Sequence, residues 1–309
     1  MTNKIFSLLI LYFLFLVNCS NNENYNENNH PNQLKSNYKH LNLTILIDLS
    51  DRISILKNPE QPEKDIEIIT YVIENFKKFL AIKGVVNSED RIKVIFYPVT
   101  QYDIYKSIAD SLNIDFGLLE FTERKIVFEL LNSKFKNNLR ELYVIASNAK
   151  SYPGSDLFNY FKHRITDDCI NSDTNFINIL TILTDGYIYY DKSKYNYKNR
   201  FSYLTPLSGH IDIFRNMNKW EEYFHNNDYG LIKIENDLSK LNILLCEFNP
   251  IYDSPKDFDI MKLYWSKWLE EQNVRKENYK IIKTEIASIN KNLINSFFEN
   301  IFKKSYVNQ

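Results

Sequence analysis

The chain has 309 residues, of which 44% are hydrophobic and 25% are charged, as in an ordinary globular protein with a buried core. Six glycines and eight prolines are too few for a collagen-like or loop-dominated chain. The formal net charge is −1, from 38 basic and 39 acidic residues, with no long run of either sign. Because nucleic-acid binding usually depends on a basic surface that contacts phosphates, this balance argues against nucleic acid as a partner.

The first nineteen residues have the pattern of an export signal. Lys4 is followed by an uncharged apolar run, Ile5 to Val17, which has the length of a signal-peptide core and is too short for a comfortable membrane span. The run ends in Leu16-Val17-Asn18-Cys19, which resembles a lipobox. The resemblance implies a bacterial lipoprotein with its lipid on Cys19, although Asn18 replaces the small residue usual at that position. An ordinary signal peptide or a short anchor is the alternative.

The next segment, residues 20–39, is rich in asparagine and almost free of apolar side chains. Such a segment cannot bury enough surface to offset its ordering entropy, so we expect a flexible tether. Residues 1–18 would then be the signal peptide, residues 19–40 the lipidated cysteine and tether, and residues 41–309 the folded domain. The expected location is the cell envelope, lipid-anchored to a bacterial membrane.

From Leu41 onward, short apolar runs alternate with segments of helical periodicity. In chain order, the sequence predicts a strand at Leu43–Ile47, a helix from Pro62 to Leu80, a strand at Arg91–Tyr97, a helix at Thr122–Asn138, a strand at Leu142–Ala146, a helix at Leu157–Arg164, strands at Phe176–Leu183 and Leu241–Phe248, a helix at Asp257–Gln272, a strand at Tyr279–Ile286 and a last helix from Ile289 to Ile301. Continuously apolar strands are typical of a mostly parallel sheet covered on both faces by helices. The expected fold class is α/β, a Rossmann-like three-layer arrangement in one domain.

Two of the predicted strands end in an aspartate. The first strand leads into Asp48-Leu49-Ser50, and the strand at Phe176–Leu183 leads into Thr184-Asp185-Gly186. Between them in sequence lies Gly154-Ser155-Asp156, a loop and N-cap for the helix that follows. Ligands of open α/β sheets bind at the carboxyl edge of the strands, so we expect these segments to form one polar site.

This set of motifs resembles the von Willebrand factor A domain and its metal-ion-dependent adhesion site. The likeness covers most of the chain from Leu41 to about Phe302. It implies a Mg²⁺ held by hydroxyls and carboxylates, with one coordination position left for an acidic side chain of a protein partner. Mg²⁺ prefers such oxygen ligands. Carried over by position, the candidate metal ligands are Asp48, Ser50, Ser155 and Asp185.

The first motif departs from the family pattern Asp-x-Ser-x-Ser, because Arg52 stands in place of the second serine. A guanidinium cannot ligate a cation and carries a permanent charge. If Arg52 points inward, it would replace the metal by pairing with Asp48 or Asp185. If it points outward, the remaining oxygens would still hold a metal, with help from Asp51. A metal-free polar pocket and a purely structural role for these residues stay open.

A second unusual feature follows Asp185 directly, where aromatic and cationic side chains alternate from Tyr187 to Tyr203. One interpretation is a recognition arm beside the site, with Tyr187 and Tyr189 as binding residues, because aromatic side chains with a polar group are favoured in interfaces. The other interpretation is a hairpin whose rings cover the flank of the domain itself.

Other chemistry has weaker support in the sequence. The five histidines show no ligand spacing, which disfavours zinc, and there is no glycine-rich phosphate loop or nucleophile elbow. Cys169 and Cys246 are interpreted as free, buried thiols, and a disulfide between them is the alternative.

The sequence therefore points to a binding module rather than an enzyme: membrane-tethered, exported, and recognising a protein with an acidic side chain, with or without Mg²⁺. One alternative is a metal-free component of an envelope, secretion or conjugation assembly. Another is a hydrolase or phosphotransferase with Asp48 as nucleophile. Haloacid-dehalogenase-like enzymes place an aspartate there, but their motif needs a second aspartate where this chain has Ser50.

Overall fold

The structure is a computed structural model that describes residues 38–97, 103–207, 209–252 and 254–307. The part of the chain from Tyr38 onward forms one compact unit by itself. The predicted signal peptide, Cys19 and nearly all of the predicted tether lie outside the described residues. Among the helices that the structure does describe, none has the length and apolarity needed to cross a bilayer.

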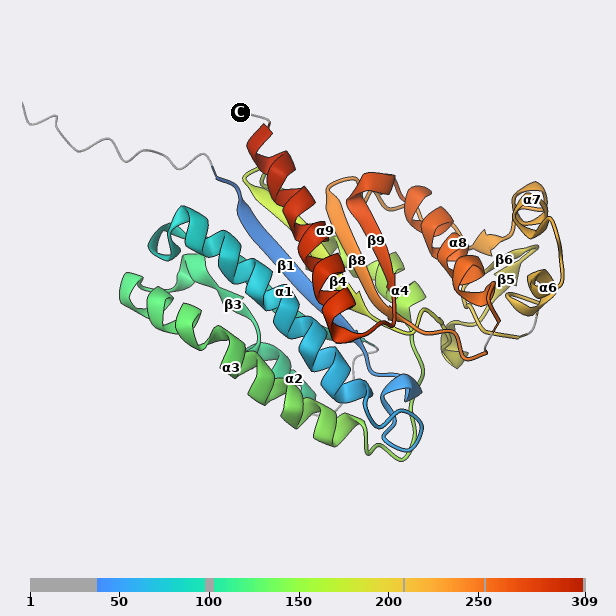
Figure 1. Ribbon diagram of the computed structural model, residues 1–309, viewed down its shortest axis with the longest axis horizontal. Coiled ribbons are helices and arrows are strands. Elements are labelled where there is room, and N and C mark those ends of the chain that lie inside the picture. The colour runs from blue at the N-terminus through green and yellow to red at the C-terminus, as the bar shows by residue number, and fades with distance from the viewer. Residues whose placement is uncertain (1–37, 98–102, 208, 253, 308–309) are drawn as a thin grey trace, which may run out of the picture. The chain divides into compact units, whose positions relative to one another are not determined.

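A mostly parallel sheet lies at the centre of the domain, and the described residues contribute six strands to it in the order β3-β2-β1-β4-β8-β9 (Figure 1). Its strands are β1 (His40–Asp48), β2 (Arg91–Tyr97), β3 (Ile114–Asp115), β4 (Phe176–Leu183), β8 (Leu241–Phe248) and β9 (Tyr279–Lys283). Neighbouring strands pair in parallel, except that the two-residue edge strand β3 is antiparallel to β2. The sequence did not predict β3, and β9 ends three residues before the predicted Ile286. The strand order reverses between β1 and β4.

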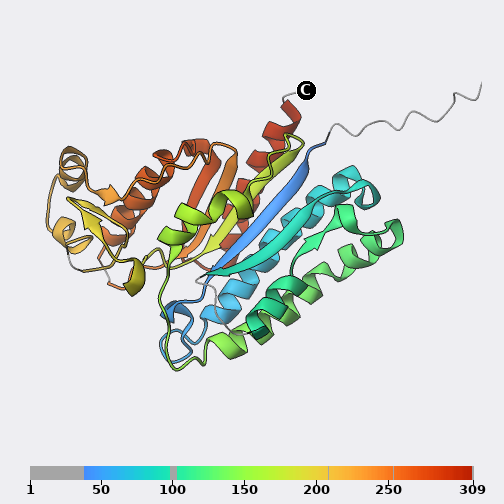
Figure 2. The same ribbon diagram turned by 180° about the vertical axis from the view of Figure 1, so that it is seen from behind.

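Helices cover both faces of this sheet (Figures 1 and 2). One face carries α1 (Gln61–Lys83), α2 (Asp103–Ser111), α3 (Phe121–Ala146) and α9 (Ala287–Val307). The other carries α4 (Leu157–His163), α5 (Ile165–Cys169) and α8 (Asp257–Glu270), with α6 (Asp212–Arg215), α7 (Trp220–Asn226) and the small sheet of β5 (Asn196–Tyr197), β6 (Arg200–Phe201) and β7 (Gly230–Leu231). The α/β class, with helices on both faces of a mostly parallel sheet, is confirmed.

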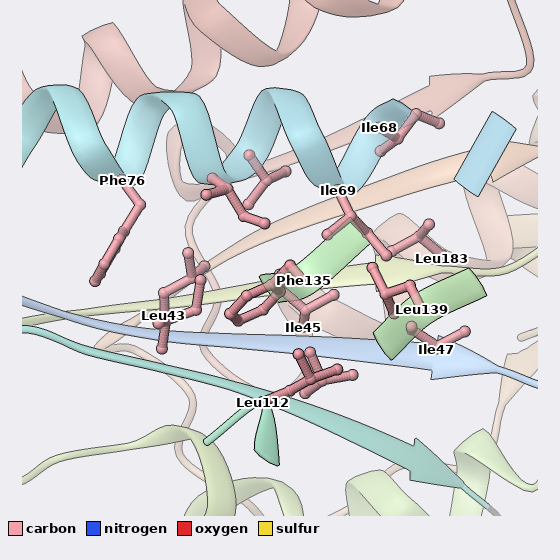
Figure 3. Packing of buried hydrophobic residues seen from close by; sticks show 14 of the residues in the cluster. Leu43, Ile45, Ile47, Ile68, Ile69, Phe76, Leu112, Phe135, Leu139 and Leu183 are labelled. Carbon is pink, nitrogen blue, oxygen red and sulfur yellow. The ribbon is translucent and has the colours of Figure 1, made fainter. Parts of the chain in front are cut away.

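The first core lies between the sheet and the layer of α1, α3 and α9. Alternate residues of β1, namely Leu43, Ile45 and Ile47, face this layer (Figure 3), whereas Leu46 belongs to the core on the opposite face. Because side chains alternate along a strand and both faces of the sheet are covered, β1 is buried at eight of its nine positions, and its run Ile45-Leu46-Ile47 is apolar without interruption. The continuous apolar runs in the sequence have this cause.

The second core is aromatic. Phe161 packs on Trp268 with ring centroids 4.5 Å apart, and Trp265 lies 5.5 Å from Trp268. Trp265 Nε1 donates a hydrogen bond of 2.8 Å to the carbonyl of Gly186. Gly186 has a φ of +94°, and a Cβ there would lie 2.5 Å from the Met261 side chain. The aromatic core therefore fixes the turn that follows β4, where the polar site lies.

The predicted strand at Leu142–Ala146 is wrong, because α3 continues without interruption to Ala146. Leu139, Leu142 and Ala146 are buried at helical spacings, while Val144 is 67% exposed. An apolar run of five residues does not distinguish a strand from a turn of helix by periodicity alone. Packing of α3 against α1 and β1 decides in favour of the helix.

The prediction of two free, buried cysteines is confirmed. Cys169 contributes to the aromatic core and Cys246 to the core on the opposite face of the sheet, so the sheet separates them. Burial raises the pKa of both thiols, that of Cys169 to about 11. Both therefore stay protonated at neutral pH and act as packing groups.

Candidate functional site

The polar residues at the ends of β1 and β4 meet at the carboxyl edge of the sheet. Asp48 is the last residue of β1, and Asp185 follows β4 after Thr184. Thr184 Oγ1 donates a hydrogen bond of 2.9 Å to Asp48 Oδ2, and the backbone N–H of Ser50 donates one of 2.9 Å to Asp48 Oδ1. The strand order reverses at this point, and such reversals are where open α/β sheets bind ligands.

Ser155 reaches the same place from the loop before α4. Its backbone exchanges two hydrogen bonds with Tyr189, of 2.8 and 3.0 Å, in an isolated antiparallel bridge. Gly154 precedes it with a φ of +95°, and a Cβ there would lie 2.1 Å from the Tyr189 carbonyl oxygen. Only glycine fits this close approach of two backbones. The loop that carries Ser155 is therefore fixed to the segment after β4.

Asp156 has a different role from the one predicted. It occupies the N-cap position of α4, but its side chain makes no capping hydrogen bond. Its Oδ1 accepts a hydrogen bond of 2.7 Å from Ser193 Oγ, and its Oδ2 accepts one from Asn159. Asp156 thus gives the Ser155 loop a second attachment to the segment after β4.

The hydroxyl of Ser155 is buried and lacks a hydrogen-bond partner among the described residues. The side chain is 4% exposed and lies near enough to Asp48 to lower the pKa of that carboxyl, although no hydrogen bond of normal geometry joins the two. Buried hydroxyls without a partner are uncommon, because the loss of water costs free energy. Ser155 Oγ is therefore free to bind a further atom at this site.

The two carboxylates of the site, Asp48 and Asp185, repel each other. Burial raises the pKa of Asp48, against the opposing effects of Arg52 and the hydrogen bonds from Ser50 and Thr184. Burial and then the charge of Asp48 raise the pKa of Asp185 to about 7. Neither has an ion-pair partner in the described part of the chain. The pair therefore favours any group that supplies positive charge or a proton.

Arg52 points inward, but it pairs with neither Asp48 nor Asp185. Its two terminal nitrogens donate to the carboxylate of Asp65 in α1, at 3.2 and 2.6 Å, and the side chain is only 3% exposed. Its Nε donates to the backbone carbonyl of Asp48 at 2.9 Å. Tyr143 of α3 donates a further hydrogen bond to Asp65. The expected pairing of an inward Arg52 with the site aspartates is thus corrected: its charge is compensated by Asp65.

Sequence reasoning also missed Glu247, near the end of β8. The side chain is 2% exposed, and burial raises its pKa. Its carboxylate accepts a hydrogen bond of 3.0 Å from Gln61, which also donates to Asp65 at 2.9 Å. An acidic residue within an apolar strand was the signal for Glu247. The signal for Asp65 was its position one helical turn before Ile69, which puts a carboxylate on the buried face of the helix.

A pocket of about 330 Å³ opens beside these residues, between the loops that follow β1 and β8. Its ionisable lining residues are Asp51, Arg52, Lys57, Asp185 and Glu247. Asp51 is exposed and forms an ion pair with Lys57, so it does not join the Asp48 cluster. Of the four candidate ligands, Asp185 lines the pocket, while Asp48, Ser50 and Ser155 are buried and do not line it. Asp185 is thus the side chain through which an external group would reach the site.

The tyrosines after Asp185 mainly support the site. The backbone N–H of Tyr187 donates to Asp185 Oδ1 at 3.0 Å, and its hydroxyl accepts a hydrogen bond from the backbone of Ile251. Tyr189 is 38% exposed, and Lys194 lies 5.4 Å from its ring centroid. The segment does contain a hairpin, formed by β5 and β6. Tyr187 therefore holds Asp185, while Tyr189 holds the Ser155 loop.

The donor set at this site consists of oxygens. Within the described ranges, no three Asp, Glu, His or Cys side chains gather closely enough to hold a metal ion. The carboxylates of Asp48 and Asp185 come together instead with the hydroxyls of Thr184 and Ser155, and Ser50 contacts Asp48 through its backbone N–H. Hard oxygen donors of this kind fit Mg²⁺ better than softer metals.

No protein-family model matches the chain, and no curated protein matches it. Solved structures similar to it include two of proximal thread matrix protein 1 from the mussel byssus, each 8% identical in sequence, with TM-scores of 0.37 and 0.39. Each alignment covers 86% of this chain and 48% of the byssus protein, so this chain spans about half the length of that protein. A similarity of this size carries no information about function.

Proposed function

We propose that the chain is an exported binding module of the cell envelope, tethered to a membrane by lipid on Cys19. Its site would resemble the von Willebrand factor A adhesion site and would bind a protein partner through a divalent cation, Mg²⁺. The observation that carries the proposal is the buried, unpartnered hydroxyl of Ser155 beside the aspartate pair Asp48 and Asp185.

The charge balance supports a cation at this site. Arg52 is the nearest positive group, and Asp65 already compensates it. Asp48 and Asp185 are thus left without a countercharge in the described part of the chain, and two such carboxylates in a buried place repel strongly. Asp48, Ser50, Ser155 and Asp185 would hold the cation, which would supply a coordination position for an acidic side chain of the partner.

Metal titration tests this proposal. We expect isothermal titration calorimetry with Mg²⁺ or Mn²⁺ to show binding to the wild type and none to Asp185→Ala. Ser155→Ala should bind more weakly because one oxygen donor is lost. Asp51→Asn is the matched control, since Asp51 lines the same pocket but pairs with Lys57. Absence of binding heat in the wild type would rule out the metal-dependent form.

The membrane tether is tested separately. Mass spectrometry of the chain from bacterial membranes should show a diacylglycerol-modified N-terminus at Cys19, and Cys19→Ser should abolish it. An unmodified chain released after an ordinary cleavage site would contradict the anchor without affecting the site.

A metal-free assembly component is the second candidate, and the buried Arg52 favours it. The guanidinium forms its ion pair with Asp65, but its charge also lowers the pKa of Asp48 and of Asp185 and so offsets part of their repulsion without a metal. Partner binding that persists in EDTA would distinguish this candidate from the first.

The hydrolase alternative has less support. Asp48 is fully buried, and both of its carboxylate oxygens accept hydrogen bonds, which leaves neither well placed to attack a substrate. Hydrolysis of p-nitrophenyl phosphate that disappears in Asp48→Asn would reinstate it.

A further inference from the structure

A group of exposed apolar side chains lies at the end of the molecule opposite the candidate site. We name it the apolar patch, and it consists of Ile82, Val86, Leu118 and Phe121. Their exposed fractions are 56%, 46%, 84% and 64%. They come from the last turn of α1, the short 3-10 turns η2 (Val85–Asn87) and η3 (Phe116–Leu118), and the first residue of α3.

Contacts of Arg124 show that these elements are neighbours. Its Nε donates to the carbonyl of Leu119 at 2.9 Å, and its terminal nitrogens donate to the carbonyls of Val86 and Gly117. Its guanidinium also lies 5.2 Å from the centroid of the Phe121 ring. The backbone segments that carry Val86 and Leu118 therefore meet at Arg124 beside the Phe121 ring, and Ile82 lies in the turn of α1 just before Val86.

Single exposed apolar residues are normal, but a group on neighbouring segments with a leucine at 84% exposure is typical of a contact surface. Exposed leucine and phenylalanine side chains are also found on surfaces that lie in a membrane interface, where apolar side chains enter the lipid. Glu120 and Glu123 are exposed nearby, so Arg124 does not make the local surface positive. Contact through this patch would thus depend on apolar burial rather than on anionic lipid.

The position at which the N-terminal segment joins the domain indicates what binds to the apolar patch. Lys83 Nζ donates to the carbonyl of Lys39 at 3.1 Å, so the entry of the N-terminal segment lies next to Ile82. Figures 1 and 2 show that β1 begins, α1 ends and α3 begins at the same end of the domain. The 19 steps along the chain from Cys19 to Tyr38 span at most about 65 Å, which keeps the domain near an anchor at Cys19.

We propose that the apolar patch docks on the lipid surface of the membrane that holds the N-terminal segment. This inference depends on the proposed function for the membrane itself, but the patch does not require the lipid on Cys19 for its test. Docking through this end would turn the Asp48–Asp185 edge, at the opposite end of the strands, away from the membrane and toward a partner.

Vesicle binding tests the patch directly. The chain from residue 19 with Cys19→Ser lacks both the lipid and the apolar run Ile5–Val17, and the compact unit from Tyr38 onward is intact in it. We expect this chain to sediment with neutral phosphatidylcholine vesicles. The double substitution Leu118→Ser with Phe121→Ser should weaken binding by at least about tenfold, because it removes two large apolar side chains from the contact.

The matched control is Leu56→Ser, which removes a leucine that is 93% exposed in the loop after β1, at the candidate-site end. It should leave vesicle binding unchanged. Both variants alter exposed side chains, and equal melting temperatures would confirm that folding is intact. A second reporter is Phe121→Trp, whose emission should shift to shorter wavelength with vesicles.

Several results would overturn the inference. They are no vesicle binding by the parent chain, equal loss of binding in the Leu56→Ser control, or a dimer that forms without vesicles and depends on Leu118 and Phe121. The last result would assign the patch to a second copy of the chain. Vesicle binding by the unlipidated chain together with an unmodified Cys19 would keep the patch and remove only the anchor.

Discussion

Arg52 is the residue whose position most affects the candidate site. Its identity in the sequence suggested either a replacement for the metal or a side chain directed to solvent. The structure has a third arrangement, in which Asp65 neutralises the guanidinium and Asp48 supplies a backbone carbonyl. A buried ion pair of this kind contributes little net stability compared with an apolar pair, but removal of one partner is costly.

We therefore expect Arg52→Ala to lower the free energy of unfolding by about 3–5 kcal/mol, because the fully buried Asp65 loses its countercharge. Urea unfolding measures this loss. The double variant Arg52→Ala with Asp65→Asn should recover part of the lost unfolding free energy. Arg140→Ala is the control, since its ion pair with Glu63 is exposed and is expected to be worth less than about 1 kcal/mol. Equal losses of unfolding free energy in Arg52→Ala and Arg140→Ala would contradict a larger contribution from the buried ion pair of Arg52.

Gly154 offers a second test at the scale of one residue. Gly154→Ala places a Cβ against the Tyr189 carbonyl oxygen and should break the bridge that holds Ser155. Gly209→Ala is matched to it, with a similar φ of +82° but nothing within 4 Å of the new Cβ. Both substitutions strain the backbone, so only the difference between them reports the bridge. We expect Gly154→Ala to be less stable than Gly209→Ala by more than about 1 kcal/mol in thermal or urea unfolding, and to bind Mg²⁺ more weakly.

At the scale of elements, α3 gives a direct test of helix against strand. In the helix Leu142 is buried and Val144 is exposed, whereas in a strand the two would share one face. Leu142→Ala should cost about 2–5 kcal/mol of unfolding free energy, and Val144→Ala should change it by less than about 0.5 kcal/mol. Comparable costs at both positions would favour the strand.

The elements that the sequence predicted well are those with a long periodic pattern. α1 carries buried residues at helical spacings over 23 residues, and six of the eight residues of β4 are apolar, so both were found with nearly correct ends. The errors fall where the local pattern is short. The run at Leu142–Ala146 has five residues and β3 has two, and their states depend on the elements against which they pack.

The candidate site was predictable in part for a topological reason. Asp48 and Asp185 follow adjacent parallel strands, so their meeting at one edge follows from the sheet. The partner of Arg52 was not predictable, because it depends on where α1 places Asp65 in three dimensions. Likewise, the unpartnered hydroxyl of Ser155 results from a backbone bridge between two loops 34 positions apart, for which the sequence shows only a glycine.

At the scale of the whole molecule, stability in acid depends on a buried group at the amino edge of the sheet. Burial by itself raises the pKa of Asp90, but the neighbouring His40, the ion pair with Lys83 and the hydrogen bond from Ser88 outweigh it and leave the pKa below its ordinary value of 3.8. The carboxylate also accepts a hydrogen bond from the backbone N–H of Leu41 at the start of β1. Asp90 therefore contributes stability that is present above about pH 4 and lost as the pH falls through its folded-state pKa.

The expected consequence is a change in the acid limb of the stability profile. Asp90→Asn should be less stable than the wild type at pH 7, and its unfolding free energy should fall less steeply between about pH 4 and pH 2. Urea unfolding at a series of pH values measures both effects. The exposed Asp259, replaced by Asn, is the control and should leave the profile unchanged. A parallel shift of the whole profile in Asp90→Asn, with the same slope in acid, would contradict the assignment.

The two edge strands of the central sheet affect whether copies of this chain aggregate at high concentration. One edge strand is β3, which has two residues, and the other is β9, which carries Lys280 and Lys283 among its five residues. A very short edge strand, and lysines on an edge strand, both disfavour the backbone pairing between molecules that leads to aggregation. Copies of this chain at high density would collide constantly, and these edge strands let them do so without joining their sheets into fibres.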